Sequence, residues 1–187
     1  MSQLCDDGQM SALVEAMKSD APGQDSLLEG LLSDFPDDAR LHFLKASILV
    51  GTGRLIEAYS SFVRTLELEP DFAIARFQLG FFQLTSGEAV SALDTWGRLD
   101  FLPDGHYLRS FVDGLRCLIR DDFVGTISNL RTGIANNSEN IPLNGDMSMI
   151  IDQCAGLSGS TFEAGGEEAV SETALILKQF GDRAKMH

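Results

Sequence analysis

Apolar residues recur three and four positions apart in short segments of the chain, which is the spacing of one face of an α-helix. In the central part of the chain these segments come in pairs. The members of each pair are separated by turn residues: Gly51-Thr52-Gly53, Ser86-Gly87 and Arg120-Asp121-Asp122. Pro70 and Pro103 follow the second members of the first two pairs, where proline cannot continue a helix. The pattern therefore predicts a series of helical hairpins, with high helix content and almost no strand.

The hairpins recur at one fixed spacing of about 34 residues along the chain, which we call the repeat interval. Each first helix has a small residue at its centre, and each second helix has a small residue followed four positions later by a large apolar or aromatic one. In chain order these residues are Ala46, Ala58 and Phe62; Gly80, Ala92 and Trp96; and Gly114, Thr126 and Leu130. Small side chains let the two helices of a hairpin approach closely, and the bulky residue fills the space between neighbouring hairpins.

This register resembles the tetratricopeptide repeat (TPR) family, whose unit of about 34 residues matches the interval and carries small residues, an aromatic residue and a proline at the corresponding positions. The resemblance implies an all-α fold, an α–α superhelix (TPR solenoid) with capping C-terminal helices. We expect a TPR domain over residues 1–155, followed by a flexible linker and a C-terminal helix over 156–187. The TPR domain is expected to contain a degenerate hairpin over 8–36, repeats over about 39–70, 73–103 and 107–138, and a short capping helix over 146–155.

The charge of the chain restricts its partners. It carries 28 acidic and 14 basic residues, a formal net charge of −14, which repels nucleic acid phosphates and anionic lipid headgroups. No apolar run approaches the roughly 20 residues that a membrane span needs, and the first residues do not have the pattern of a signal peptide. We therefore expect a cytoplasmic protein that does not bind nucleic acid or insert into a membrane.

The sequence contains no constellation of catalytic or metal-binding residues. Its three histidines, His42, His106 and His187, are far apart, and Cys5, Cys117 and Cys154 lack the spacing of zinc ligands. No glycine-rich phosphate loop or nucleophile motif occurs. We therefore expect no metal, no cofactor and no enzymatic activity.

The TPR resemblance also implies a binding site, because in that family the first helix of each repeat lines a concave groove. In this chain the positions concerned are mostly apolar from the second repeat onward. The predicted groove residues are Phe43, Ser47, Ile74, Phe77, Phe81, Leu84, Leu108, Phe111, Leu115 and Leu118. The family's clamp for a terminal carboxylate is not expected, since its basic and amide positions correspond to Phe43, Ser47, Gln78, Leu108 and Val112.

An apolar groove predicts a protein-binding adaptor or small chaperone that holds an apolar peptide or helix. Three occupants stay open: a partner's amphipathic segment, the chain's own C-terminal helix, or a second copy in a homodimer. The first two are compatible, because a displaceable internal helix would compete with the partner. The alternative function is a homo-oligomeric scaffold that uses the groove for self-association.

Overall fold

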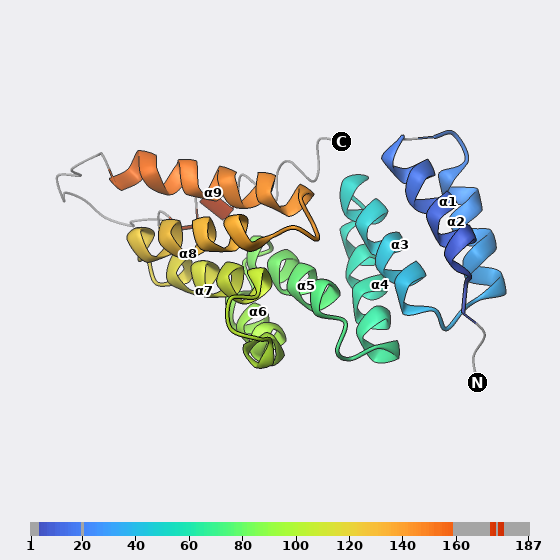
Figure 1. The fold of residues 1–187 in the computed structure, drawn as a ribbon, viewed down its shortest axis with the longest axis horizontal. Coiled ribbons are helices and arrows are strands. Elements are labelled where there is room, and N and C mark those ends of the chain that lie inside the picture. Colours follow the sequence, from blue (N-terminus) through green and yellow to red (C-terminus); the bar gives the residue numbers. More distant parts are fainter. Residues whose placement is uncertain (1–3, 20, 159–172, 175, 178–187) are drawn as a thin grey trace. The chain divides into compact units, whose positions relative to one another are not determined.

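The structure is a computed structural model that describes residues 4–19, 21–158, 173–174 and 176–177 (Figure 1). All regular secondary structure in these residues is helical, which confirms the all-α class. The helices are α1 (Asp7–Lys18), α2 (Gln24–Asp34), α3 (Ala39–Gly51), α4 (Leu55–Leu68), α5 (Ala73–Thr85), α6 (Ala89–Trp96), the 3₁₀ helix η1 (Gly97–Phe101), α7 (Tyr107–Ile119), α8 (Phe123–Asn136) and α9 (Pro142–Ser158).

The helix boundaries follow the repeat interval of the sequence. Helices α3, α5 and α7 each contain 13 residues, and their first residues, Ala39, Ala73 and Tyr107, are separated by that interval. The first residues of α4, α6 and α8 are separated by the same interval. The register that the small residues indicate is therefore also the register of the helices.

The C-terminal part differs from the prediction in one respect. The helix expected over 146–155 is longer, because α9 already begins at Pro142 and continues to Ser158. Proline is well suited to the first turn of a helix, where its missing N–H has no partner to lose. Most of the predicted linker and C-terminal helix over 156–187 lies outside the described residues.

The chain divides into two compact units, one covering Met1–Ala75 and the other Arg76–Met186. The boundary falls inside α5. Each unit is described here by itself.

The core of the first unit lies between α1, α2 and α3. Leu13, Leu28, Leu31 and Leu41 are buried together there. In the α3–α4 hairpin, the ring of Phe43 lies 6.3 Å from that of Phe62 and 5.2 Å from that of Phe72. Burying such side chains is the main source of stability for a unit of this size.

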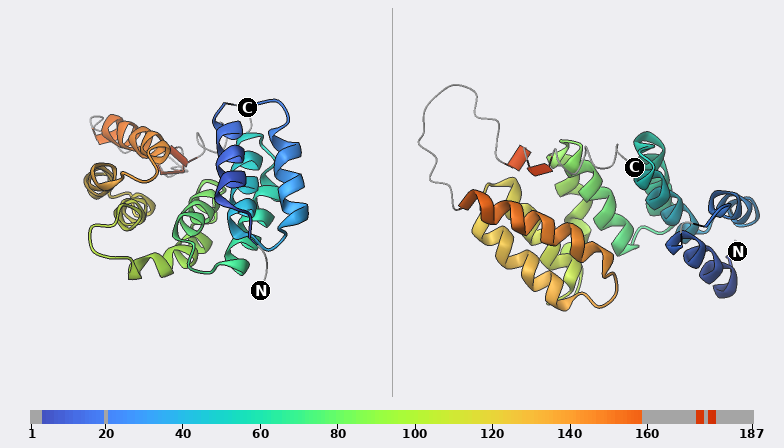
Figure 2. Two further views of the ribbon diagram at one scale, coloured as in Figure 1. Left: turned by 45° about the vertical axis from the view of Figure 1, so that its right-hand side comes forward. Right: turned by 90° about the horizontal axis from the view of Figure 1, so that it is seen from above.

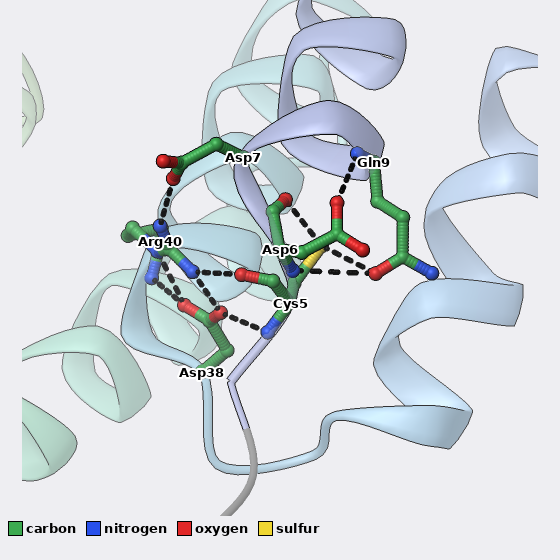
Figure 3. Close-up of polar contacts among 6 residues, drawn as sticks. All are labelled: Cys5, Asp6, Asp7, Gln9, Asp38 and Arg40. Atoms are coloured by element: carbon green, nitrogen blue, oxygen red, sulfur yellow. Dashed lines mark hydrogen bonds and ion pairs between the residues drawn. The ribbon is translucent and has the colours of Figure 1, made fainter.

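A polar cluster ties the N-terminal segment of the first unit to the start of α3 (Figure 3). The buried Asp38 caps α3, and its carboxylate accepts hydrogen bonds from the backbone N–H groups of Cys5 and Arg40, both at 3.0 Å. The Arg40 guanidinium donates to Asp38 and, at 2.7 Å, to the carbonyl of Cys5. Burial by itself disfavours the charged Asp38, but these hydrogen bonds outweigh it and lower the pKa of Asp38 below its usual value.

The second unit is built on close contacts at its small residues. The Trp96 side chain lies against Gly80 and donates from Nε1 to the carbonyl of Phe77 at 3.1 Å. One repeat later, Leu130 lies against Gly114 in the same way. Helix α8 packs against α7 on one side and α9 on the other, as Figure 1 and the left view of Figure 2 show.

Candidate functional site

The predicted groove residues differ in how far the structure exposes them. Phe43, Ser47, Ile74 and Phe81 are half-buried. The other six side chains are buried within the described part of the chain: Phe77, Leu84, Leu108, Phe111, Leu115 and Leu118. A ligand would therefore reach most of these positions only if the elements that cover them moved.

Part of this set forms an aromatic cluster in the second unit. The ring of Phe77 lies 6.2 Å from that of Phe81 and 5.9 Å from that of Phe111, and Phe111 meets Tyr107 edge to face at 5.7 Å. The structure thus brings together the faces of α5 and α7 that the sequence predicts to act together. Phe43, Ser47 and Ile74 belong to the first unit, whereas this cluster belongs to the second.

A residue from the C-terminal part of the chain, Thr173, is held at the end of α7. The hydroxyl of Thr173 lies 2.7 Å from the carbonyl oxygen of Leu118 and 2.6 Å from a carboxylate oxygen of Asp121. Ile176 and Leu177, three and four positions after Thr173 in the chain, are also buried. A segment that is distant in the chain is therefore held at one of the predicted groove residues.

The seat for Thr173 is formed by the way α7 ends. The carbonyl of Leu118 accepts the N–H of Asp121 at 3.0 Å and has a second lone pair for the threonine hydroxyl. Asp121 has a φ of 57°, in the left-handed region that asparagine and aspartate adopt more readily than most residues. The turn thereby places two acceptors, a helix-terminal carbonyl and a carboxylate, beside each other.

A second set of apolar positions is exposed and was not predicted from the sequence. Ile56, Val90 and Val124 are the second residues of α4, α6 and α8, and they are 86%, 76% and 76% exposed. They are separated by the repeat interval, and so are the exposed Tyr59 and Leu93. The repeat register could have identified them, because a position that is apolar in every repeat is visible once the repeats are aligned.

Burial favours the neutral forms of two titratable groups in the second unit, Tyr107 and Cys154. Burial, reinforced by the charge of Glu139, raises the pKa of Tyr107 to about 12, and burial raises that of the Cys154 thiol to about 11. In the described ranges, no group of three or more His, Cys, Asp or Glu side chains is placed to hold a metal ion. The contacts that distinguish this site are therefore those of a packing surface with two polar acceptors.

The chain was also compared with known proteins. No protein-family model matches it, and no curated protein matches it significantly. In the part of the chain that the structure describes, no helix combines the length and the apolar character that crossing a bilayer requires.

Proposed function

We propose that this protein is a non-catalytic, TPR-like protein-binding module, an adaptor or small chaperone, that holds an apolar peptide or helix against α5 and α7. One observation carries the proposal: the second unit already holds Thr173 of its own chain at the end of α7, and Ile176 and Leu177, which follow it in the chain, are buried. A surface that accepts such a segment from its own chain has the shape and chemistry to accept one from another protein.

The aromatic cluster supports the same proposal. Phe81 is only half-buried although its ring stacks on the fully buried Phe77. An aromatic side chain in this position offers a large apolar contact area at little cost in conformational entropy, and such residues dominate the energy of protein interfaces.

The second candidate function is a homo-oligomeric scaffold. The exposure of Val90 and Val124 at equivalent positions of the second unit favours it, because exposed apolar side chains that recur at one position provide a repeated contact surface. In this case the surface for self-association is on α6 and α8 rather than on α5 and α7.

One matched pair of variants separates these functions. Phe81→Glu places a charge on the α5–α7 face, and Val90→Glu places the same charge on an exposed position of α6 in the same unit. If the proposal holds, Phe81→Glu abolishes partner capture in a pull-down from the native lysate, and Val90→Glu retains it. Helix content and thermal unfolding of both variants, measured by circular dichroism, verify that each is folded, and the milder Phe81→Ala should weaken capture several-fold.

The opposite pattern would contradict the proposal. If Phe81→Glu and Phe81→Ala retain full capture, the α5–α7 face is not the binding site. If Val90→Glu instead converts a dimer that persists at low micromolar concentration into a monomer, as measured by light scattering, the scaffold function is favoured.

A further inference from the structure

The described C-terminal residues bury one face of a helical turn. Thr173, Ile176 and Leu177 are separated by three and four positions, the spacing of neighbours on a helix surface. These three side chains are 7%, 3% and 8% exposed, whereas Ala174, which is not on that face, is exposed. The turn therefore has a definite contact face, consisting of one hydroxyl and two aliphatic side chains.

The polar half of this contact is selective for a donor. Thr173 meets two acceptors, the carbonyl of Leu118 and the carboxylate of Asp121. The carbonyl belongs to the last turn of α7, where the helix dipole contributes partial negative charge, and Asp121 adds a full negative charge. A neutral hydroxyl can donate its single proton to one of these acceptors at a time, whereas a carboxylate at the same position would be repelled by both.

We propose that the C-terminal end of α7, at Leu118 and Asp121, is a binding seat for a short helical segment with a hydroxyl donor followed by aliphatic residues three and four positions later. Thr173, Ile176 and Leu177 are the resident occupant of this seat. The inference rests on the proposed protein-binding function and specifies the partner's chemistry: the partner segment carries the same pattern, with no acidic residue at the hydroxyl position, and it displaces the chain's own segment.

Because the seat is already occupied by the chain's own segment, a partner segment can bind only by replacing it. Because it is attached to the same chain, its local concentration is high, so a free peptide of the same sequence competes poorly against it. The apparent affinity of an outside segment is reduced in proportion to the fraction of molecules whose seat is vacant. Weakening only the resident segment should therefore increase the uptake of an outside segment, with the seat itself unchanged.

The test uses full-length protein with substitutions in the resident segment alone. Thr173→Val removes the donor but keeps the shape, Thr173→Asp adds a repelled charge, and Thr173→Ser keeps the donor as the matched control. The probe is a fluorescent synthetic peptide with the sequence of residues 167–181, and its binding is followed by fluorescence anisotropy.

Relative to the native chain, we expect the peptide to bind about five- to tenfold more tightly to Thr173→Val and more than tenfold more tightly to Thr173→Asp. Binding to Thr173→Ser should be unchanged. A peptide that itself carries Thr173→Asp should not bind to any of the chains. Hydrogen exchange at the amides of Arg120 and Asp121 should become faster in Thr173→Val and Thr173→Asp, because the segment beside them is released more often.

Equal peptide binding by all four chains, or no binding by any of them, overturns the inference. So does a native dimer that the peptide converts to a monomer, because the occupant would then come from a second copy. If these results occur while Phe81→Glu still abolishes partner capture, the seat fails and the protein-binding function stands. If the peptide behaves as expected but partner capture survives Phe81→Glu, the seat is an internal contact and the proposed function fails.

Discussion

Replacing Gly80 with alanine is the sharpest test of how the second unit packs. A Cβ atom at this position would lie 2.1 Å from Nε1 of Trp96 and 2.6 Å from two other atoms of the indole ring. Trp96 is fully buried and its N–H is bonded to the carbonyl of Phe77, so the ring cannot move aside without losing that bond. The methyl group must therefore displace the ring or push the two helices apart.

The expected cost follows from three contributions. Inserting an atom into a packed core costs about 1 to 3 kcal/mol. Leaving the buried Trp96 N–H without its acceptor costs about 1 to 3 kcal/mol more. Alanine is better than glycine in a helix by about 1 kcal/mol, which offsets part of the loss. The free energy of unfolding should fall by about 1 to 5 kcal/mol.

Urea denaturation followed by tryptophan fluorescence measures this change directly, because Trp96 is the single tryptophan of the chain. The matched control is Gly145→Ala in α9 of the same unit, where an added Cβ meets no atom within 4 Å. That variant should be stabilised by up to about 1 kcal/mol. If Gly80→Ala were as stable as the native protein, the described packing of Trp96 against α5 would be incorrect.

A double variant checks the mechanism of this loss. The first hairpin has Ala46 and Phe62 at the positions that correspond to Gly80 and Trp96, and both are buried. The Gly80→Ala substitution should therefore cost less in a Trp96→Phe background than in the native one, with unfolding in both backgrounds followed by far-UV circular dichroism because Trp96→Phe removes the single tryptophan. A cost that is the same in both backgrounds would show that the two positions are not coupled.

Two further predictions concern helix caps. Asp38→Ala should lower the free energy of unfolding by about 2 to 4 kcal/mol, because it removes the α3 cap and the partner of Arg40. The pKa of Asp38 is lowered in the folded state, so its contribution to stability is fully present above the usual carboxyl pKa of about 4 and is lost as the pH falls through the lowered value. Urea titrations should therefore give converging free energies of unfolding for the native protein and Asp38→Ala below that lowered pKa. A constant difference down to strong acid would contradict this. Asp122→Ala should cost only about 1 kcal/mol, since the Asp122 side chain accepts one hydrogen bond, from the Gly125 N–H at 2.8 Å. A loss as large as that of Asp38→Ala would show that the number of hydrogen bonds to the capping carboxylate does not decide the difference.

The sequence was most informative at positions where packing geometry requires one particular type of residue. Gly80 and Gly114 lie against Trp96 and Leu130, and the interval between these pairs also sets the interval between the helices. Hydrophobic spacing was sufficient to predict the hairpins, because a helix must bury its apolar face whatever the details of the contact. The arrangement of the hairpins as a TPR superhelix stays a prediction.

The sequence was least informative about contacts between distant segments. The hydrogen bond of Cys5 to Asp38 joins residues 33 positions apart outside any repeat, and that of Thr173 to Leu118 joins residues 55 positions apart. Neither follows from periodicity, since periodicity describes which face of a helix is apolar and not which segment covers it. For the same reason, Leu115 and Leu118 could be assigned to one face of α7 but their complete burial could not be anticipated.

The burial of α7 determines how any partner can act on it. Leu130 of α8 packs on Gly114, the ring of Phe77 on Phe111, and Asp100 of η1 pairs with Arg116 at 2.6 Å. Releasing the contacts of Leu130 or Phe77 would expose the core of the unit, which costs about 2 to 5 kcal/mol for each large side chain. The contact of Thr173 at the end of the helix is different, because it comes from residues beyond the hairpins and can be replaced by an equivalent segment. The end of α7 is therefore the part of this face where a partner can be exchanged without unfolding the second unit.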